Sequence, residues 1–201
     1  MLIYALQGVG YGFAAAVQPG PLQTYLISQT LKNGRRRTLP AALAPLISDG
    51  LILAVVLLVL SRVPGWFTRF LYIAGGCFVL YLAVGAFRAW RGFEATSSVA
   101  VESSQQSVFK AAMTNALNPG PYLYWSLVTG PVLLAGWRET PINGIGFLMG
   151  FYIAIVSTLA GTILLFGTAG QFGSKVNRAL LGVSASALAC FGLYQLWRGL
   201  H

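Results

Sequence analysis

"AVQPGPLQTY" (residues 16–25) places two prolines around a glycine inside an otherwise apolar stretch. The same tripeptide returns in "ALNPGPYLYW" (residues 116–125). Proline has no backbone N–H to donate and its ring clashes with the preceding turn, so each segment predicts a break in a helix. The two breaks stand at matching places in the two halves of the chain, which indicates that the fold contains an internal repeat.

The composition is that of a membrane protein. Hydrophobic residues make up 56% of the chain and charged residues only 8%, whereas soluble domains carry about 25% charged residues. A bilayer core of about 30 Å needs about 20 mainly apolar residues in one helix. Six runs, uncharged apart from Asp49, predict six transmembrane helices: residues 1–31, 38–61, 70–87, 111–137, 140–174 and 179–197.

The net charge of +9 does not indicate a nucleic-acid partner, because the basic residues flank the apolar runs. Their distribution instead indicates how the protein is oriented in the membrane. By the positive-inside rule, the side with more lysine and arginine faces the cytoplasm, which predicts both termini outside it. The cytoplasmic group is Lys32, Arg35, Arg36, Arg37, Arg88, Arg91, Lys110, Lys175 and Arg178, against Arg62, Arg69, Arg138 and Arg198 on the other side.

A second pair of similar segments supports an internal repeat. "GAFRAWRG" (residues 85–92) closes the third run and "GLYQLWRG" (residues 192–199) closes the sixth. The prediction is one all-α membrane domain built from two three-helix repeats, residues 1–92 and 108–201, joined by a cytoplasmic linker, residues 93–107. A short surface helix in the Ser/Gln-rich linker is left open. Three spans per repeat invert the second copy relative to the first.

Broken helices at membrane depth expose backbone groups. Pro19 and Pro21 are expected to leave the carbonyls of Ala15 and Val17 without intrahelical donors, and Pro119 and Pro121 to do the same to Asn115 and Leu117. Such ends can meet the ammonium and carboxylate of a small zwitterion; the alternative is a pair of packing kinks. The predicted substrate-binding residues are Gln18, Pro19, Gly20, Pro21, Asn115, Asn118, Pro119, Gly120 and Pro121.

Asp49 is the only acidic residue inside any of the six runs. An ionisable side chain there is costly and marks a functional site. Burial favours its neutral form and a substrate ammonium favours its ionised form, which suits the coupling site of a proton-coupled antiporter. The alternative is a structural aspartate paired with an arginine or capping exposed amides. Pro45 and Gly50 predict an irregular backbone around it.

The remaining signals are structural. Gly8-x-x-x-Gly12 and Gly146-x-x-x-Gly150 predict close helix packing. Cys77 and Cys190, which lack CxxC spacing, are expected to be buried, and no metal or cofactor site is predicted. Four aromatic residues of the second half could line a cavity, but anchoring of helices at the membrane interfaces is favoured for each: Tyr122, Tyr124, Trp125 and Tyr152.

The chain resembles the LysE/RhtB-type amino acid exporters. The resemblance rests on "QPGP" (18–21), "NGRRRTLPAALAPLISDG" (33–50) and "NPGPYLYW" (118–125), with Gly120 standing where many members have lysine. It implies gradient-driven export of amino acids or related metabolites across the bacterial inner membrane, by a six-helix bundle that is often a homodimer. Its partners would be a small zwitterion, a proton or other coupling ion, and lipid. The mapped residues are Pro19, Gly20, Pro21, Asp49, Asn118, Pro119 and Pro121.

With one intramembrane acid, a neutral amino acid is favoured over a dicationic one. No His lies inside a predicted span and no HExxH motif occurs, so an enzyme is not predicted. Two competing functions remain: a transmembrane thiol-disulfide electron carrier of the cytochrome-biogenesis type, which needs a symmetry-related cysteine pair, and a passive channel.

Overall fold

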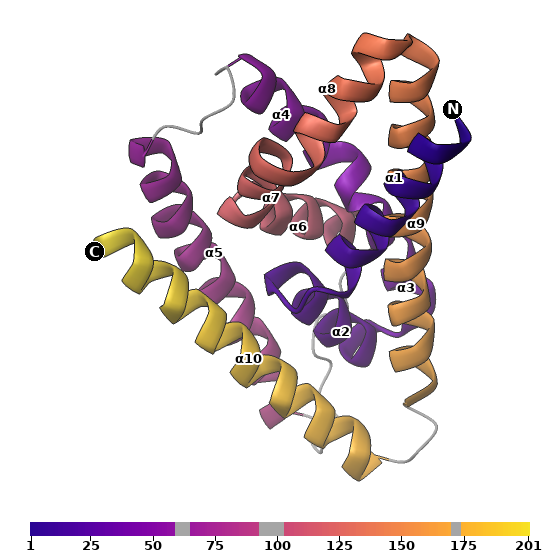
Figure 1. The fold of residues 1–201 in the computed structure, drawn as a ribbon. Coiled ribbons are helices and arrows are strands. Elements are labelled where there is room, and N and C mark those ends of the chain that lie inside the picture. Colours follow the sequence, from indigo (N-terminus) through magenta and orange to yellow (C-terminus); the bar gives the residue numbers. More distant parts are fainter. Residues whose placement is uncertain (59–64, 93–102, 170–173) are drawn as a thin grey trace.

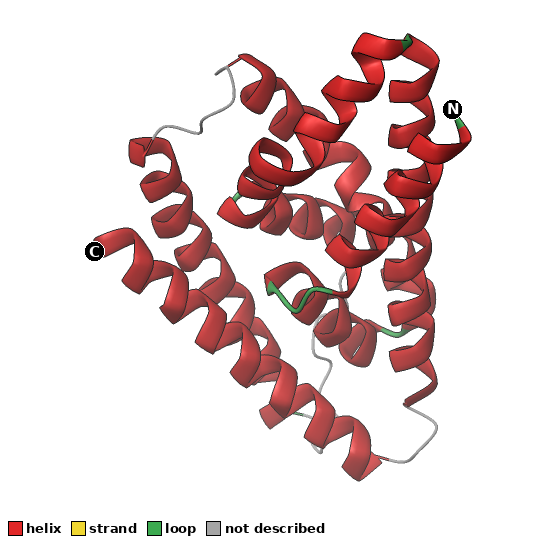
Figure 2. Cartoon of the chain, viewed as in Figure 1, coloured by secondary structure: helices red, strands yellow, loops and turns green. Residues whose placement is uncertain are grey.

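The computed structural model describes residues 1–58, 65–92, 103–169 and 174–201, and every regular element in these ranges is helical (Figures 1 and 2). The elements are α1 (Leu2–Val17), α2 (Pro21–Asn33), α3 (Arg35–Thr38), the 3-10 segment η1 (Leu39–Leu43), α4 (Ala44–Leu58), α5 (Gly65–Arg91), α6 (Ser104–Ala116), α7 (Pro119–Tyr124), the π-helical segment η2 (Trp125–Thr129), α8 (Gly130–Glu139), α9 (Pro141–Ala169) and α10 (Ser174–Leu200).

Four stretches of the described chain are long and apolar enough to cross a membrane: Arg35–Val56, Gly65–Arg91, Pro141–Thr168 and Arg178–Leu200. They correspond to the second, third, fifth and sixth predicted runs. The first and fourth runs are instead divided into shorter helices at their Pro-Gly-Pro segments. An all-α membrane protein with these two runs broken is therefore what the structure shows.

The first break separates α1 from α2. Gln18 is extended (φ −63°, ψ 121°) and so is Gly20 (φ −166°, ψ −179°), and Figure 2 shows the segment as a loop between two helices. Pro21 then begins α2 at the first helical position, where a missing N–H removes no helical hydrogen bond and the fixed φ suits the helix. The tripeptide both ends one helix and starts the next.

The second break lies between α6 and α7. The side chain of Asn118 accepts a hydrogen bond from the Gly120 N–H (3.1 Å) and caps α7, which begins at Pro119. The π-helical segment η2 follows and ends just before Pro131, whose ring would clash with the preceding turn of a regular α-helix. The regular α-helix of the fourth apolar run is thus interrupted twice, first at the Pro-Gly-Pro segment and then by the π-helical segment.

Glycines set the crossing of α1 and α9, which lie side by side in Figure 1. A Cβ on Gly8 would collide with the carbonyl oxygen of Phe147, one on Gly12 with that of Phe151, and one on Gly150 with that of Ala5. Only glycine lets the two backbones approach so closely. The close packing predicted from the Gly-x-x-x-Gly spacings is confirmed.

Helices α5 and α10 pack along each other in opposite directions (Figure 1). Near one end of the pair a Cβ on Gly199 would press on Ile73, and near the other a Cβ on Gly182 would press on Trp90. Trp90 and Gly199 belong to the two similar segments of the sequence, so those segments lie at opposite ends of the helix pair.

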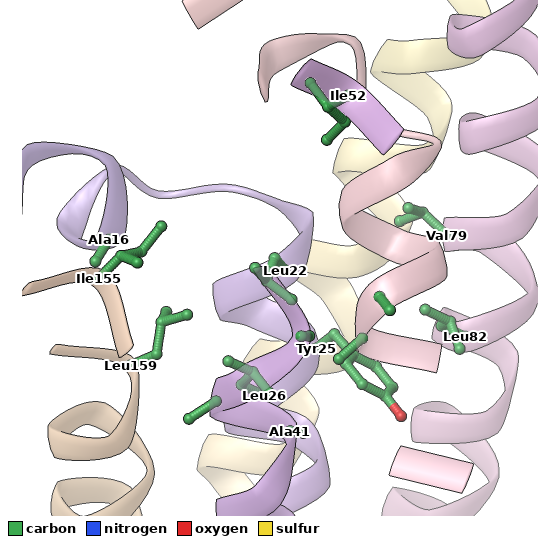
Figure 3. Close-up of a cluster of buried hydrophobic side chains, with 14 of the residues drawn as sticks. Ala16, Leu22, Tyr25, Leu26, Ala41, Ile52, Val79, Leu82, Ile155 and Leu159 are labelled. Atoms are coloured by element: carbon green, nitrogen blue, oxygen red, sulfur yellow. The ribbon is translucent and has the colours of Figure 1, made fainter. Parts of the chain in front are cut away.

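A buried apolar core joins α2, η1, α4, α5 and α9. Leu22, Tyr25 and Leu26 of α2 contribute its centre, as Figure 3 shows. Large apolar side chains on the outside of the helices are exposed, as a surrounding of lipid requires. Cys77 and Cys190 belong to this exposed set. Their predicted burial is wrong, because a membrane-facing position gives a small apolar side chain an equally dry environment.

One local expectation differs from the structure, and one question that the sequence left open is answered in part. The irregular backbone predicted around Asp49 lies earlier, in η1, and Asp49 sits in regular α-helix because Pro45 occupies the first turn of α4, where no N–H is needed. Helix α6 begins at Ser104, inside the predicted linker, with a reciprocal capping box between Ser103 and Gln106. Residues 93–102 of that linker lie outside the described ranges.

The basic residues separate into two groups in space. Lys32, Arg88 and Lys110 line one cavity near the C-terminal ends of α2 and α5, beside α6, and the guanidinium of Arg178 lies 5.7 Å from the ring centre of Trp90. At the opposite end Arg69 donates hydrogen bonds to the carbonyls of residues 199 and 200, both 2.8 Å long. Basic residues from separate helices therefore gather at a common end.

Candidate functional site

A central cavity of about 280 Å³ lies between the two breaks. Aromatic and aliphatic side chains from α5, α9 and α10 form its apolar walls, among them Tyr72, Phe151 and Tyr194. All ten residues predicted for substrate binding or coupling line it, although their roles stay predictions: Gln18, Pro19, Gly20, Pro21, Asp49, Asn115, Asn118, Pro119, Gly120 and Pro121.

Asp49 is buried, with 3% of its surface exposed, and its carboxylate faces the second break. The side-chain amide of Asn115 donates to Oδ1 (2.9 Å) and the indole N–H of Trp125 donates toward Oδ2 (3.4 Å). Both donors are neutral. The alternative of an arginine partner therefore finds no support among the side chains that the structure describes.

Asn115 fixes the end of α6 against α4. Its Nδ2 donates to the hydroxyl of Ser48 (2.7 Å) as well as to Asp49, and Ser48 in turn donates to the carbonyl of Ala44 (3.0 Å). One amide thus orients two side chains one residue apart on the same helix. This series of hydrogen bonds positions the carboxyl group of Asp49 at the wall of the cavity.

Trp125 is a site residue that sequence reasoning assigned to the wrong place. The membrane interface was favoured for it over a cavity wall, yet only 1% of it is exposed and it lines the cavity beside Asp49. Its ring packs on Phe151 with centroids 4.9 Å apart. The π-helical segment begins at Trp125, and such widened turns are common at functional sites. Pro131, six residues after Trp125, is the feature of the sequence that could have indicated this widened turn.

Gln23 satisfies the carbonyls at the first break. Its Nε2 donates to the carbonyl oxygens of Ala15 (3.3 Å) and Ala16 (3.1 Å). The Ala15 carbonyl has no intrahelical donor at Pro19, as predicted, but it is not open to a ligand, because a side chain from the next helix folds back onto it. The polar amide bridges α1 and α2 across the break.

The second break is closed in a similar way by groups of the protein. The N–H of Asn118 donates to the carbonyl of Asn115 (3.2 Å), and the hydroxyl of Tyr122 donates to the carbonyl of Ala116 (2.9 Å). The expected open carbonyl of Asn115 is thus also occupied, because the chain turns tightly there. Side chains at the cavity and the first N–H groups of α2, which have no intrahelical acceptor, are available to a ligand.

Gln195 of α10 is a second residue that the sequence reasoning missed. Its Nε2 donates toward Oδ1 of Asn118 (3.4 Å), and its buried Oε1 has no hydrogen-bond partner among the described residues. The internal repeat could have indicated this residue, because both similar segments carry a polar side chain at the same position. Gln195 of "GLYQLWRG" stands where "GAFRAWRG" has Arg88. A buried acceptor at the cavity wall is available to a donor on a ligand.

The Gln23 bridge leads to a stability prediction. We expect Gln23→Ala to lower the free energy of unfolding by about 1–3 kcal/mol, since two carbonyls lose their donor at a half-buried position. The midpoint of thermal unfolding in detergent measures this. Gln105→Ala, at an exposed position on α6, is the matched control and should change the midpoint little. Equal midpoints for Gln23→Ala and the wild type would contradict the bridging role.

Comparison with known proteins gives one family. The LysE type translocator family model matches residues 13–199, which is nearly the whole chain. Comparison with curated proteins and with solved structures gives no significant match. Members of the matched family are membrane transporters, and a multi-pass α-helical protein with a polar central cavity fits that class. The chain therefore belongs to the LysE type translocator family.

Proposed function

We propose that the protein is a secondary active exporter of amino acids or related small zwitterionic metabolites across the bacterial inner membrane. One observation carries the proposal: a single cavity brings Asp49 together with both Pro-Gly-Pro breaks. A buried acid and two interrupted helices at one site are the features of alternating-access carriers. They are not features of a cavity formed by packing kinks alone.

The cavity offers complementary groups for the two ends of an amino acid. The carboxylate of Asp49 and Oε1 of Gln195 are acceptors for an ammonium group. The N-terminus of α2 carries N–H groups and a partial positive charge that suit a carboxylate. Because Asp49 is the only acidic residue among the described residues that line the cavity, one positive charge is matched, which favours a neutral amino acid as substrate.

Asp49 would couple transport to a proton by antiport. In one state of the cycle the carboxyl group holds a proton, and in the other it releases that proton and binds the substrate ammonium. Asn115 and Trp125 donate hydrogen bonds to it, and these neutral donors stabilise the ionised form without replacing the substrate as counter-charge. Because the proton and the substrate ammonium use the same carboxyl group in turn, one proton is exchanged for one substrate molecule.

Alternating access would come from two inverted repeats with six spans. The opposed packing of α5 and α10 supports this arrangement, because these helices are the third elements of the two repeats. A layer of buried side chains, Leu22, Tyr25, Val79 and Leu82, separates the central cavity from the basic end. Movement of α2 against α5 would open this layer.

The orientation follows from charge. We place the basic end, with Lys32, Arg88 and Lys110, in the cytoplasm and both termini outside it. Accessibility of a cysteine introduced at the exposed position Arg36, labelled in intact cells and in inverted vesicles, tests this placement. Labelling only in inverted vesicles is expected, and labelling in intact cells would reverse the topology.

Counterflow in proteoliposomes tests the function. Liposomes are loaded with a mixture of unlabelled amino acids, and labelled amino acids are added outside one at a time. Saturable uptake of one or a few of them is the expected result. Uptake that increases linearly with concentration would indicate a passive channel, and no uptake by folded protein would reject amino acids as substrates.

A cysteine-free variant separates transport from thiol chemistry. Cys77 and Cys190 are free and exposed, so we expect Cys77→Ser/Cys190→Ser to keep the substrate affinity and the maximal rate of the wild type within about twofold. The same counterflow measurement checks this. Loss of activity in a variant that remains folded would instead favour the electron-carrier alternative.

A further inference from the structure

Helix α9 forms one wall of the central cavity with apolar side chains. Phe151, Ile155 and Leu159 are the residues of α9 in the described lining, and all three are buried. Their spacing of four residues places them on one face of the helix, so they form a continuous strip, the α9 strip. Backbone groups inside a helix are bonded to one another, so the strip offers a ligand neither a hydrogen-bond donor nor an acceptor.

The α9 strip begins beside the buried acid. The indole N–H of Trp125 donates toward Oδ2 of Asp49 (3.4 Å), and the same ring packs on Phe151 with centroids 4.9 Å apart. Ile155 follows about 6 Å farther along the helix axis, at a rise of about 1.5 Å per residue. A ligand whose ammonium group binds Asp49 therefore has the strip as a neighbouring wall of the cavity.

Apolar groups of other helices continue this surface. Ala15 of α1, Leu22 of α2 and Phe191 of α10 also line the cavity. Figure 3 shows Ile155 and Leu159 on the side of α9 that faces α1 and α2. An alkyl group of a ligand that lies against the strip is removed from water, and each buried methylene strengthens binding about fourfold.

Several polar side chains of the cavity are engaged at the breaks and at the acid. Nδ2 of Asn115 donates to Asp49, Nε2 of Gln23 donates to carbonyls of α1, and Oδ1 of Asn118 accepts from the Gly120 N–H. None of these groups belongs to α9. A hydroxyl or amide of a ligand that faces the α9 strip would therefore lose its water without gaining a partner from the strip, which weakens binding.

We propose that the α9 strip is the subsite for the side chain of the transported amino acid, and that the substrates are neutral amino acids with an apolar side chain of three or more carbons. Ile155, in the middle of the strip, determines this specificity. The inference rests on the proposed function, because it takes the ligand of the cavity to be an amino acid whose ammonium binds Asp49. It adds the chemical class of the side chain and the helix that selects it.

Binding of valine and threonine tests the proposal. The two amino acids have nearly the same shape and differ by a methyl group against a hydroxyl. The unfolding midpoint of the purified protein in detergent is measured at increasing concentrations of each, since a ligand of the folded state raises the midpoint. For equal shifts the wild type should need about 10- to 100-fold more threonine than valine, the usual cost of a hydroxyl in an apolar pocket.

Two substitutions of nearly equal shape test Ile155 itself. Ile155→Thr supplies a hydroxyl to the subsite, so the ratio of threonine to valine concentrations should fall about tenfold. Ile155→Val has no hydroxyl and should keep the ratio close to that of the wild type. Ile153→Thr is the control on the same helix, because Ile153 is 60% exposed and does not line the cavity. If Ile155→Thr does not fold, the wild-type ratio alone decides the substrate class.

The outcomes distinguish the subsite from the transport function. Equal shifts by valine and threonine in the wild type, or no shift by either, would overturn the subsite. An unchanged ratio in Ile155→Thr, or an equal fall in Ile153→Thr, would overturn the assignment to Ile155. Preferential stabilisation by valine in a protein that shows no counterflow would reject export and leave the subsite in place. Counterflow of small polar amino acids alone would support export and reject the subsite.

Discussion

Asp49→Asn is expected to abolish substrate accumulation driven by a pH gradient. A gradient of one pH unit supplies about 1.4 kcal/mol per proton, which supports about tenfold accumulation of a substrate exchanged for one proton. Asparagine cannot bind and release a proton, so the internal and external concentrations should become equal. Labelled substrate in proteoliposomes with an imposed gradient measures the ratio.

The same variant also distinguishes the two roles of the carboxyl group. Asparagine has nearly the same shape and keeps an acceptor for Asn115 or Trp125, so the fold should survive. Retained counterflow would assign the proton alone to Asp49, and lost counterflow would assign the substrate ammonium as well. Glu139→Gln, at an exposed carboxyl that accepts from Tyr4 and Asn143, is the control and should accumulate normally. Tenfold accumulation by Asp49→Asn would contradict coupling through this residue.

Gly12→Ala is expected to destabilise the protein strongly, although it adds a single methyl group. The new Cβ would lie within the backbone of Phe151, so α1 has to move away from α9 along the crossing. Overpacking of this kind costs about 3 kcal/mol, more than the gain of up to about 1 kcal/mol from replacing a helical glycine by alanine. The unfolding midpoint and the yield of monodisperse protein in detergent measure the effect.

Gly10→Ala is a matched control in the same helix. Gly10 has no atom within 4 Å of the position of a Cβ, so the substitution should leave stability unchanged or increase it slightly. A difference between two alanines two residues apart can only come from the packing against α9. Similar midpoints for the two variants would mean that α1 does not pack on α9 as described.

The sequence indicates the breaks and the acid because these depend on local chemistry. A proline removes its own N–H wherever the chain lies, so the ends of α1 and α6 follow from positions 19 to 21 and 119 to 121. The cost of burying Asp49 likewise follows from the apolar run around it. These residues were predicted as one site, and they surround one cavity.

The partners of these groups could not be predicted, because they depend on helix rotation and on contacts between distant segments. Gln23 folds back across the break onto α1, and Gln195 reaches Asn118 from a helix at the end of the chain. Trp125 turns inward through a π-helical segment. The cysteines were misplaced for another reason: in lipid, apolar character does not separate the inside of the protein from its surface.

Protection of an introduced cysteine by substrate tests the central claim most directly. Gly120→Cys, made in the cysteine-free variant, places a thiol at the exposed edge of the second break, within the cavity lining. Arg36→Cys in the same background provides an exposed thiol outside the cavity. The account predicts that the transported amino acid, at a saturating concentration, slows maleimide labelling at position 120 and not at position 36. Equal labelling rates at position 120 with and without substrate would contradict a binding site between the two breaks.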